Sequence, residues 1–300
     1  MVYKSQRRAT NGEQMIKEKE SNIERVLQKK ADWLRRRVLA MTVKAKAGHV
    51  APSFSCAEIL TAIYYGGYFR VRPKDPHWAD RDIFILSKGQ AAVALYAILA
   101  DLGFFPLSEL MTFTQKGSRL GGHTENTIPG VEAFTGSLGH GICIAAGVAL
   151  AFKRDGKKSV CISLLGDGEC HEGSVWEAVM FASQHRLNNL CAIIDHNGLS
   201  ATDFLEDYLS VAPLKDKFEA FGWEVETVDG HSIGGILSVV RRFRERVSKK
   251  PLAVIAKTTK GKGVSFMENK PIWHYRIPVG RELEMARKEL SCSCLKKRRI

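Results

Sequence analysis

The sequence predicts an α/β protein with a mostly parallel sheet and helices on both faces. Short runs of β-branched and aliphatic residues alternate with longer segments whose apolar residues recur at helical spacing. Two of these runs, 160–165 and 190–194, are apolar almost throughout, which is typical of strands buried on both faces of a sheet. A helical segment separates them, so they form a βαβ unit whose strand ends meet at one edge. Ligands of such sheets bind at that edge.

The other segments continue this alternation along the chain. We expect strands at 83–86, 160–165, 190–194, 224–228 and 252–257. We expect helices at about 13–47, 56–65, 91–102, 138–153, 174–186, 214–221 and 233–247. Residues 48–53 are expected to form a turn, and the helix at 138–153 is expected to be buried because its small residues allow close packing.

Positive charge is concentrated at the two ends of the chain. The first 37 residues carry 11 Lys and Arg against 5 Asp and Glu, and the last 20 carry 7 against 3, so the ends supply 10 of the net charge of +13. A nucleic-acid groove needs charge on the folded body, so we expect solvated ends or contacts with an acidic partner instead.

The composition indicates a cytoplasmic protein with reduced cysteines. No run approaches eighteen apolar residues, and the charged N-terminus does not resemble a signal peptide. The seven cysteines are an odd number, and most lie in apolar runs. We therefore expect neither a membrane span nor a disulfide framework.

A Gly-Asp-Gly turn follows the first strand of the βαβ unit. Gly166 and Gly168 allow the backbone to turn sharply and to approach a ligand closely. Asp167 between them offers a hard oxygen suited to Mg²⁺ or Ca²⁺, and Asn197 adds a neutral oxygen after the second strand. Together with a backbone carbonyl near Leu199, these groups predict a site for a metal-bound diphosphate, although such a triplet taken alone is often only a turn.

The segment from this turn to Asn197 resembles the thiamine diphosphate-binding signature, in the form that transketolases have. Further segments resemble the same family in order along the chain: AGHVAPSFSCAEIL, DIFILSKGQAAVALYAIL, GGHTE, FTGSLGHGICIAAGVALA, FGWEVETVDGHS, and KTTKGKGVSFME followed by WHYRIP. The likeness covers most of the chain, from about residue 39 to 278. It implies the thiamine diphosphate-binding fold and the diphosphate-binding module of a transketolase.

The resemblance assigns the cofactor site residue by residue. Asp167, Asn197 and the carbonyl of Leu199 would bind Mg²⁺, with Ca²⁺ or Mn²⁺ as possible substitutes. Other residues would lie on the cofactor side: Gly139, His140, Gly166, Gly168, Glu169 and His231. For His231 the alternative is a helix cap near Ser232, and for Lys257 and Lys260 a solvated loop is as plausible as a contact with an anion.

Three histidines match those that line the substrate channel of transketolases, namely His49, His123 and His274. Cleavage of a ketose C–C bond moves protons on hydroxyl groups, and imidazoles near neutrality give or accept such protons. The resemblance therefore implies a catalytic role for all three.

The resemblance also implies a partner, because the half of a transketolase that contacts the aminopyrimidine ring is absent from this chain. We expect the N-terminal subunit of a split transketolase, which acts with a pyrimidine-domain subunit in an α₂β₂ assembly on a ketose and an aldose. Glu172 and Glu177 match acidic residues near the subunit interface of the family. The predicted organisation is a basic helical extension at 1–37, the cofactor-binding domain at 38–278 and a basic tail at 279–300.

Two departures from the family pattern lie at the substrate end. Gln90 stands where transketolases usually have histidine, and it cannot carry a proton at neutral pH. Tyr275 follows His274 where many relatives have glycine. We expect cofactor use to be retained and the sugar to be unusual. The alternatives are a non-catalytic paralogue, a deoxyxylulose phosphate synthase-like enzyme and a 2-oxoacid dehydrogenase-like subunit, although GGHTE and WHYRIP favour transketolase.

Overall fold

Five parallel strands form one central sheet in a computed structural model, which describes residues 2–292 and the side chains of residues 20–291. The strand order is β1-β2-β3-β5-β4, and every neighbouring pair is parallel. The strands are β1 (Ile83–Leu86), β2 (Cys161–Gly166), β3 (Leu190–His196), β4 (Glu224–Asp229) and β5 (Leu252–Lys257). The predicted fold class is confirmed, and each strand begins within one residue of its expected start.

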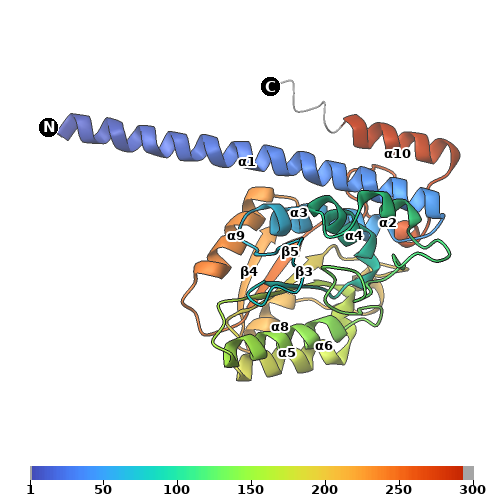
Figure 1. The fold of residues 1–300 in the computed structure, drawn as a ribbon. Coiled ribbons are helices and arrows are strands. Elements are labelled where there is room, and N and C mark those ends of the chain that lie inside the picture. Colours follow the sequence, from blue (N-terminus) through green and yellow to red (C-terminus); the bar gives the residue numbers. More distant parts are fainter. Residues whose placement is uncertain (1, 293–300) are drawn as a thin grey trace.

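Helices cover both faces of the sheet (Figure 1). On one face lie α1 (Val2–Ala45), α3 (Ala57–Tyr65), α4 (Ala92–Leu102) and α9 (Ile233–Glu245). On the other lie α5 (His140–Arg154), α6 (Gly173–Gln184) and α8 (Leu214–Ala220). The shorter helical segments are α2 (Val50–Ser55), α7 (Leu205–Tyr208) and the 3-10 turns η1 (Gly89–Ala91), η2 (Leu107–Thr112), η3 (Gly168–His171) and η4 (Pro271–His274).

The apolar strand runs divide their side chains between two cores. In β2, Ile162 and Leu164 lie in the core beneath α1, α3 and α4, whereas Leu165 lies in the core beneath α5 and α6. In β3, Ile193 and Ile194 are divided in the same way. Because successive side chains of a strand point to opposite faces, these strands need apolar residues at every position.

Helix α1 is continuous across the predicted boundary at residue 38. Its buried residues Ala31, Leu34, Val38 and Met41 recur at intervals of three or four and face the core. The helix also extends well beyond the sheet toward the N-terminus (Figure 1). The predicted boundary at residue 38 thus lies within α1, a helix that was expected to run on to about residue 47.

Three local expectations differ from the structure. Residues 50–55 form helix α2 instead of a turn, and Pro52 fits there because the first turn of a helix needs no donor from it. The segment expected as a tail begins with helix α10 (Gly280–Cys292), where Ala286 and Leu290 are buried. Helix α5 is buried on one side only, since Ile144 is 39% exposed. The expected tail beyond residue 292 lies outside the described residues.

No helix in the described part of the chain combines the length and the apolarity needed to cross a membrane.

Candidate functional site

A cavity of about 340 Å³ opens at the carboxyl ends of β2 and β3. This is the edge where parallel sheets bind ligands. Ten of the residues predicted for the site line it: His49, Gln90, His123, Gly166, Asp167, Gly168, Glu169, Asn197, Leu199 and His274. The sequence thus identified most of a single cavity from segments up to 225 positions apart.

The two predicted metal donors lie side by side because their strands are paired. Gly166 is in register with Asp195, so the residues that follow each strand, Asp167 and Asn197, emerge from neighbouring strand ends. The Asp167 side chain is almost fully buried, and its carboxylate accepts hydrogen bonds from the backbone N–H groups of Gly168 (2.9 Å) and Gly198 (2.5 Å). His196 Nδ1 lies 3.1 Å from the same carboxylate.

The donors at this end fit a divalent cation that a diphosphate shares. No group of three His, Cys, Asp or Glu side chains with metal-binding geometry occurs among the described residues, so protein carboxylates alone do not complete a shell. Asp167 supplies one carboxylate and Asn197 one amide oxygen, both of which are hard ligands. A Cβ atom built at Gly166 would meet no atom closer than 3.9 Å, so the glycine leaves room for phosphate oxygens to approach the backbone.

The Glu169 carboxylate stabilises the turn at residues 166–168, which contains Asp167, by hydrogen bonds. This buried carboxylate accepts hydrogen bonds from the Ser87 hydroxyl and from the N–H groups of Gly139 (2.9 Å) and Gly166 (3.1 Å). Burial raises the pKa of Glu169. Gly139 is therefore joined to the site through Glu169 and does not itself line the cavity.

The three predicted channel histidines meet at the opposite end of the cavity. The ring centroid of His49 lies 5.5 Å from that of His123 and 5.1 Å from that of His274. Burial, reinforced by nearby groups that are positive when protonated, lowers the pKa of His49 to about 4 and that of His274 to about 3. Both rings are therefore neutral at pH 7 and can accept protons or hydrogen-bond sugar hydroxyls.

Lys260 joins the two ends of the cavity. Its ammonium group donates hydrogen bonds to the carbonyl of Ser200 and to Nδ1 of His274, the latter at 2.9 Å. Burial, together with the field of Lys88, lowers the pKa of Lys260 to about 8. Lys257 is the exposed last residue of β5, whereas Lys260 is buried, so neither side chain belongs to a solvated loop.

A buried ion pair beneath the cavity was not predicted from the sequence. The ammonium of Lys88 contacts the carboxylate of Asp195, and both side chains are at most 2% exposed. The hydroxyls of Ser55 and Thr258 also donate to this carboxylate. Burial disfavours both charges, but their mutual attraction outweighs it, so the pKa of Lys88 is raised and that of Asp195 is lowered. In the sequence, Lys88 and Asp195 each stand just after an apolar strand run, and no spacing relates the two.

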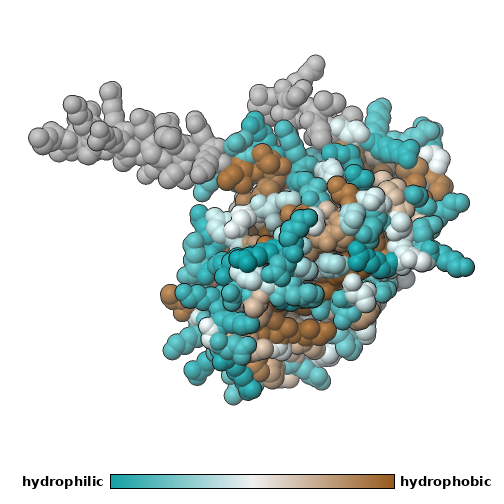
Figure 2. Space-filling model, in the orientation of Figure 1, coloured by the Kyte–Doolittle hydropathy of each residue, from teal (hydrophilic) through white to brown (hydrophobic). Residues whose placement is uncertain are grey.

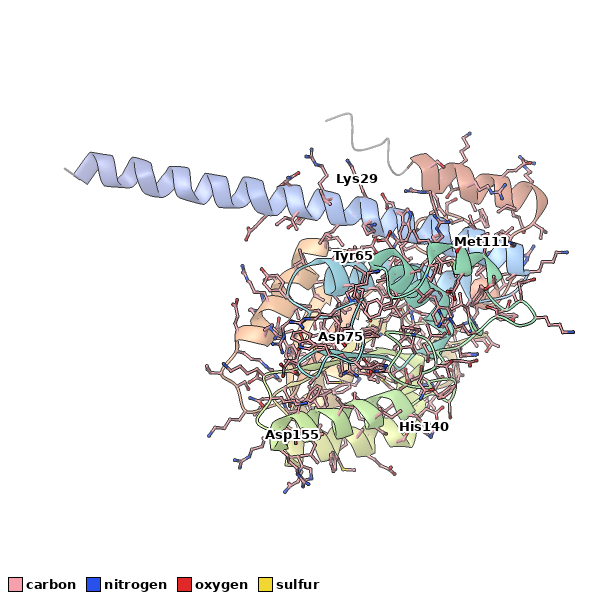
Figure 3. The ribbon with its side chains drawn as sticks, viewed as in Figure 1. Lys29, Tyr65, Asp75, Met111, His140 and Asp155 are labelled. Atoms are coloured by element: carbon pink, nitrogen blue, oxygen red, sulfur yellow. The ribbon has the colours of Figure 1, made fainter. Side chains whose placement is uncertain are left out.

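Two predicted cofactor residues, His140 and His231, do not line this cavity. His140 is exposed at the start of α5, where Nδ1 lies 3.1 Å from the carbonyl of Leu138 (Figure 3). His231 is occupied on both ring nitrogens, by Glu58 and by the backbone of Thr259. The expected cofactor-side role of both histidines therefore has no support from the cavity lining and stays a prediction.

The predicted interface acids and the departures from the family pattern lie at accessible positions. Glu172 and Glu177 are both exposed, at the start and in the middle of α6. Gln90 lines the cavity close to Gly166. Tyr275 is 56% exposed, and its ring centroid lies 4.7 Å from that of His49. The bulk expected beside a channel histidine is therefore present at the mouth of the site.

Known proteins with similar sequences and structures are transketolases. Residues 27–293 match the family model "Transketolase, thiamine diphosphate binding domain". One subunit of an apulose-4-phosphate transketolase of Actinobacillus succinogenes is 42% identical over 269 residues, which cover 88% of this chain and 95% of that protein. One subunit of a 6-deoxy-6-sulfo-D-fructose transketolase of Clostridium sp. is 39% identical over 83% of this chain and 89% of that protein.

Transketolases of the single-chain type are longer than this chain. The crystal structure of Campylobacter jejuni transketolase superposes with a TM-score of 0.83 at 33% identity and covers 89% of this chain but only 43% of its own. Human transketolase is 38% identical, and the match covers 38% of its length. The predicted fold, cofactor class and N-terminal subunit type are thereby confirmed. The chain belongs to the transketolase family and carries its thiamine diphosphate-binding domain.

Proposed function

We propose that this chain binds the diphosphate of thiamine diphosphate through Mg²⁺ and transfers a two-carbon ketol unit together with a separate subunit. The observation that carries the proposal is the single cavity that joins a metal-binding end to a histidine end. Asp167, Asn197 and the carbonyl of Leu199 would hold the cation, which Ca²⁺ or Mn²⁺ could replace because all three ions prefer oxygen ligands.

The residues of the chain have distinct roles in this proposal. Thiamine diphosphate, when bound, supplies the carbon nucleophile and the electron sink for cleavage of the ketose C–C bond. His49 and His274 are neutral: His49 accepts or returns the proton of the sugar hydroxyl, whereas His274 and His123 hydrogen-bond the sugar. Lys260 keeps Nδ1 of His274 occupied, so that the proton of the neutral ring resides on Nε2.

A partner subunit with the pyrimidine domain would complete the site, in an α₂β₂ assembly. Two relatives are named as single subunits of a transketolase, which supports a partner for this chain. Helix α6, which begins just after Glu172 and contains Glu177, packs against α5. Exposed apolar side chains of these two helices include Ile144, Met180 and Phe181. Figure 2 shows hydrophobic surface over the part of the molecule where α5 lies in Figure 1. We propose this side of the molecule as the contact with the partner.

The sugar substrate is proposed to differ from those of ordinary transketolases. Gln90 replaces a proton carrier with an amide that only hydrogen-bonds, and Tyr275 places an exposed aromatic ring against His49. The names of two relatives specify apulose-4-phosphate and 6-deoxy-6-sulfo-D-fructose, both uncommon ketoses. An uncommon ketose or ketose phosphate is therefore the proposed donor here as well.

A ketol-transfer assay with and without the partner tests the function. The chain alone, supplied with thiamine diphosphate and Mg²⁺, is expected to show no turnover, because the proposed partner would supply the pyrimidine-side half of the site. Addition of the pyrimidine-domain subunit is expected to give turnover with at least one member of a panel of ketoses and ketose phosphates. Turnover by the chain alone would refute the split site. Cofactor binding without turnover on the whole panel would favour the non-catalytic paralogue.

The affinity for thiamine diphosphate is expected to fall between pH 7 and pH 9 because Lys260 loses its charge. Its pKa is lowered to about 8, so the ammonium is present below that pH and is lost as the pH rises through it. If the bound anion holds the proton on Lys260, the affinity falls by up to about tenfold. Calorimetric titration at both pH values measures the change.

Two variants serve as controls for this pH dependence. Lys260→Met should weaken binding at pH 7 and remove most of the change with pH. Lys257→Met alters the exposed lysine three residues earlier and should leave the wild-type dependence intact. An unchanged pH dependence in Lys260→Met would show that another group titrates.

A further inference from the structure

The three successive residues 258–260, which lie beside the cavity, each form hydrogen bonds with a different part of the fold. The hydroxyl of Thr258 donates to Asp195, and its N–H donates to the carbonyl of His196 at 3.0 Å. Lys260 donates to Ser200 and His274 across the cavity. Thr259, between them, donates its N–H to Nε2 of His231 at 2.9 Å. The backbone that carries Lys260 therefore depends on a histidine outside the cavity.

The acceptor role fixes the tautomer of His231. Nε2 must be unprotonated to accept from Thr259, so in the neutral ring Nδ1 carries the proton and donates to Glu58 at 3.0 Å. Both nitrogens are then satisfied, and the ring has one donor and one acceptor partner. A 180° rotation of the ring would place Cδ2 and Cε1 against Glu58 and Thr259 and would break both hydrogen bonds.

The orientation of His231 is set in turn by a buried ion pair between two helices. Glu58 of α3 accepts two hydrogen bonds of 2.6 Å from the guanidinium of Arg35 of α1, and both side chains are at most 4% exposed. Arg35 also donates to the carbonyl of Phe54. Burial opposes the charge of Glu58, but Arg35 outweighs it and lowers the pKa of Glu58 below its usual value. A fixed carboxylate thus faces Nδ1 of His231.

We propose that His231 is a positioning residue, which holds the Thr259 amide and thereby places Lys260 in the cofactor cavity. Arg35 and Glu58 orient the imidazole, so the first helix of the chain acts on the site without contacting it. The consequence for the cofactor rests on the function proposed above. The expected effect on the backbone at Thr259 does not depend on that function.

A pair of substitutions separates the two hydrogen bonds of the ring. The amide of His231→Gln lies at the ε position and can accept from Thr259, whereas the amide of His231→Asn lies at the δ position and can donate only to Glu58. Amide hydrogen exchange at Thr259 in the whole chain is expected to accelerate by about tenfold in the asparagine variant and by less than about threefold in the glutamine variant. His77→Asn, at an exposed histidine, is the matched control and should exchange as the wild type does.

The affinity for thiamine diphosphate with Mg²⁺ should follow the same order, with the asparagine variant weaker and the glutamine variant close to the wild type. If His231 served only to satisfy Glu58, the order of the two variants would be reversed. Wild-type exchange in both variants, or equal acceleration with equal loss of melting temperature, would also overturn the proposal. Faster exchange at Thr259 with unchanged cofactor affinity would support the role of His231 in holding the Thr259 amide, but it would refute an effect of His231 on the cofactor site.

Discussion

Replacing Asp167 with alanine is expected to abolish Mg²⁺-dependent binding of thiamine diphosphate. Asp167 is the one carboxylate of the proposed donor set, and Asn197 and a backbone carbonyl cannot balance the charge of the cation alone. The loss of affinity should exceed about a hundredfold, which is the upper range for removing a group that merely orients a ligand. Calorimetric titration with and without Mg²⁺ measures it.

Asp167 also accepts hydrogen bonds from Gly168 and Gly198, so a second variant is needed to separate charge from local structure. Asp167→Asn keeps the shape and one acceptor oxygen but removes the charge, and it should lose binding almost as completely. Asp155→Asn, at an exposed aspartate at the end of α5, is the matched control (Figure 3). Wild-type affinity in Asp167→Asn would refute the metal assignment.

Replacing Lys88 with methionine is expected to lower the free energy of unfolding by about 3–5 kcal/mol, because it leaves the Asp195 carboxylate buried without its counterion. Urea denaturation at pH 7 measures the change. At that pH the pair is fully charged in the native protein, since the pKa of Asp195 is lowered and that of Lys88 is raised.

Two further variants test the cause of this loss. Lys30→Met breaks a partly exposed ion pair with Asp101 and should cost less than about 1 kcal/mol. The double variant Lys88→Met/Asp195→Asn has no unpaired charge. Its amide oxygen can accept from one of the hydroxyls of Ser55 and Thr258 and its NH2 group can donate to the other, so the variant should recover more than half of the loss. A double variant as unstable as the single one would show that packing around Lys88, and not charge, is responsible.

The strands and the metal-binding end were predictable from the sequence for local physical reasons. A strand buried on both faces needs an almost continuous apolar run, and a glycine or a charged residue marks where that run ends, as at Gly166 and Asp195. Because parallel strands end at the same edge, the adjacency of Asp167 and Asn197 followed from the βαβ pattern alone.

The contacts between distant charged residues could not be predicted in this way. Lys88 and Asp195 are 107 positions apart, and His231 and Glu58 are 173 apart. Neither pair has a periodicity or a spacing that relates its members, and their pairing depends on how the helices pack over the sheet. Helix α10 was missed for a different reason. Its few apolar residues that pack on the core, Leu283, Ala286 and Leu290, lie within a strongly charged segment.

Because β2 pairs directly with β3, the positions of Asp167 and Asn197 relative to each other do not depend on how many residues connect the two strands. The distance between the strand ends is set by one inter-strand spacing, about 4.8 Å, whatever lies in the residues that connect them. Insertions or deletions near the end of α6 or in its connection to β3 can therefore accumulate in evolution without moving Asp167 relative to Asn197. A shift of one residue in the β2–β3 register, in contrast, would turn Asn197 to the other face of the sheet and remove the site.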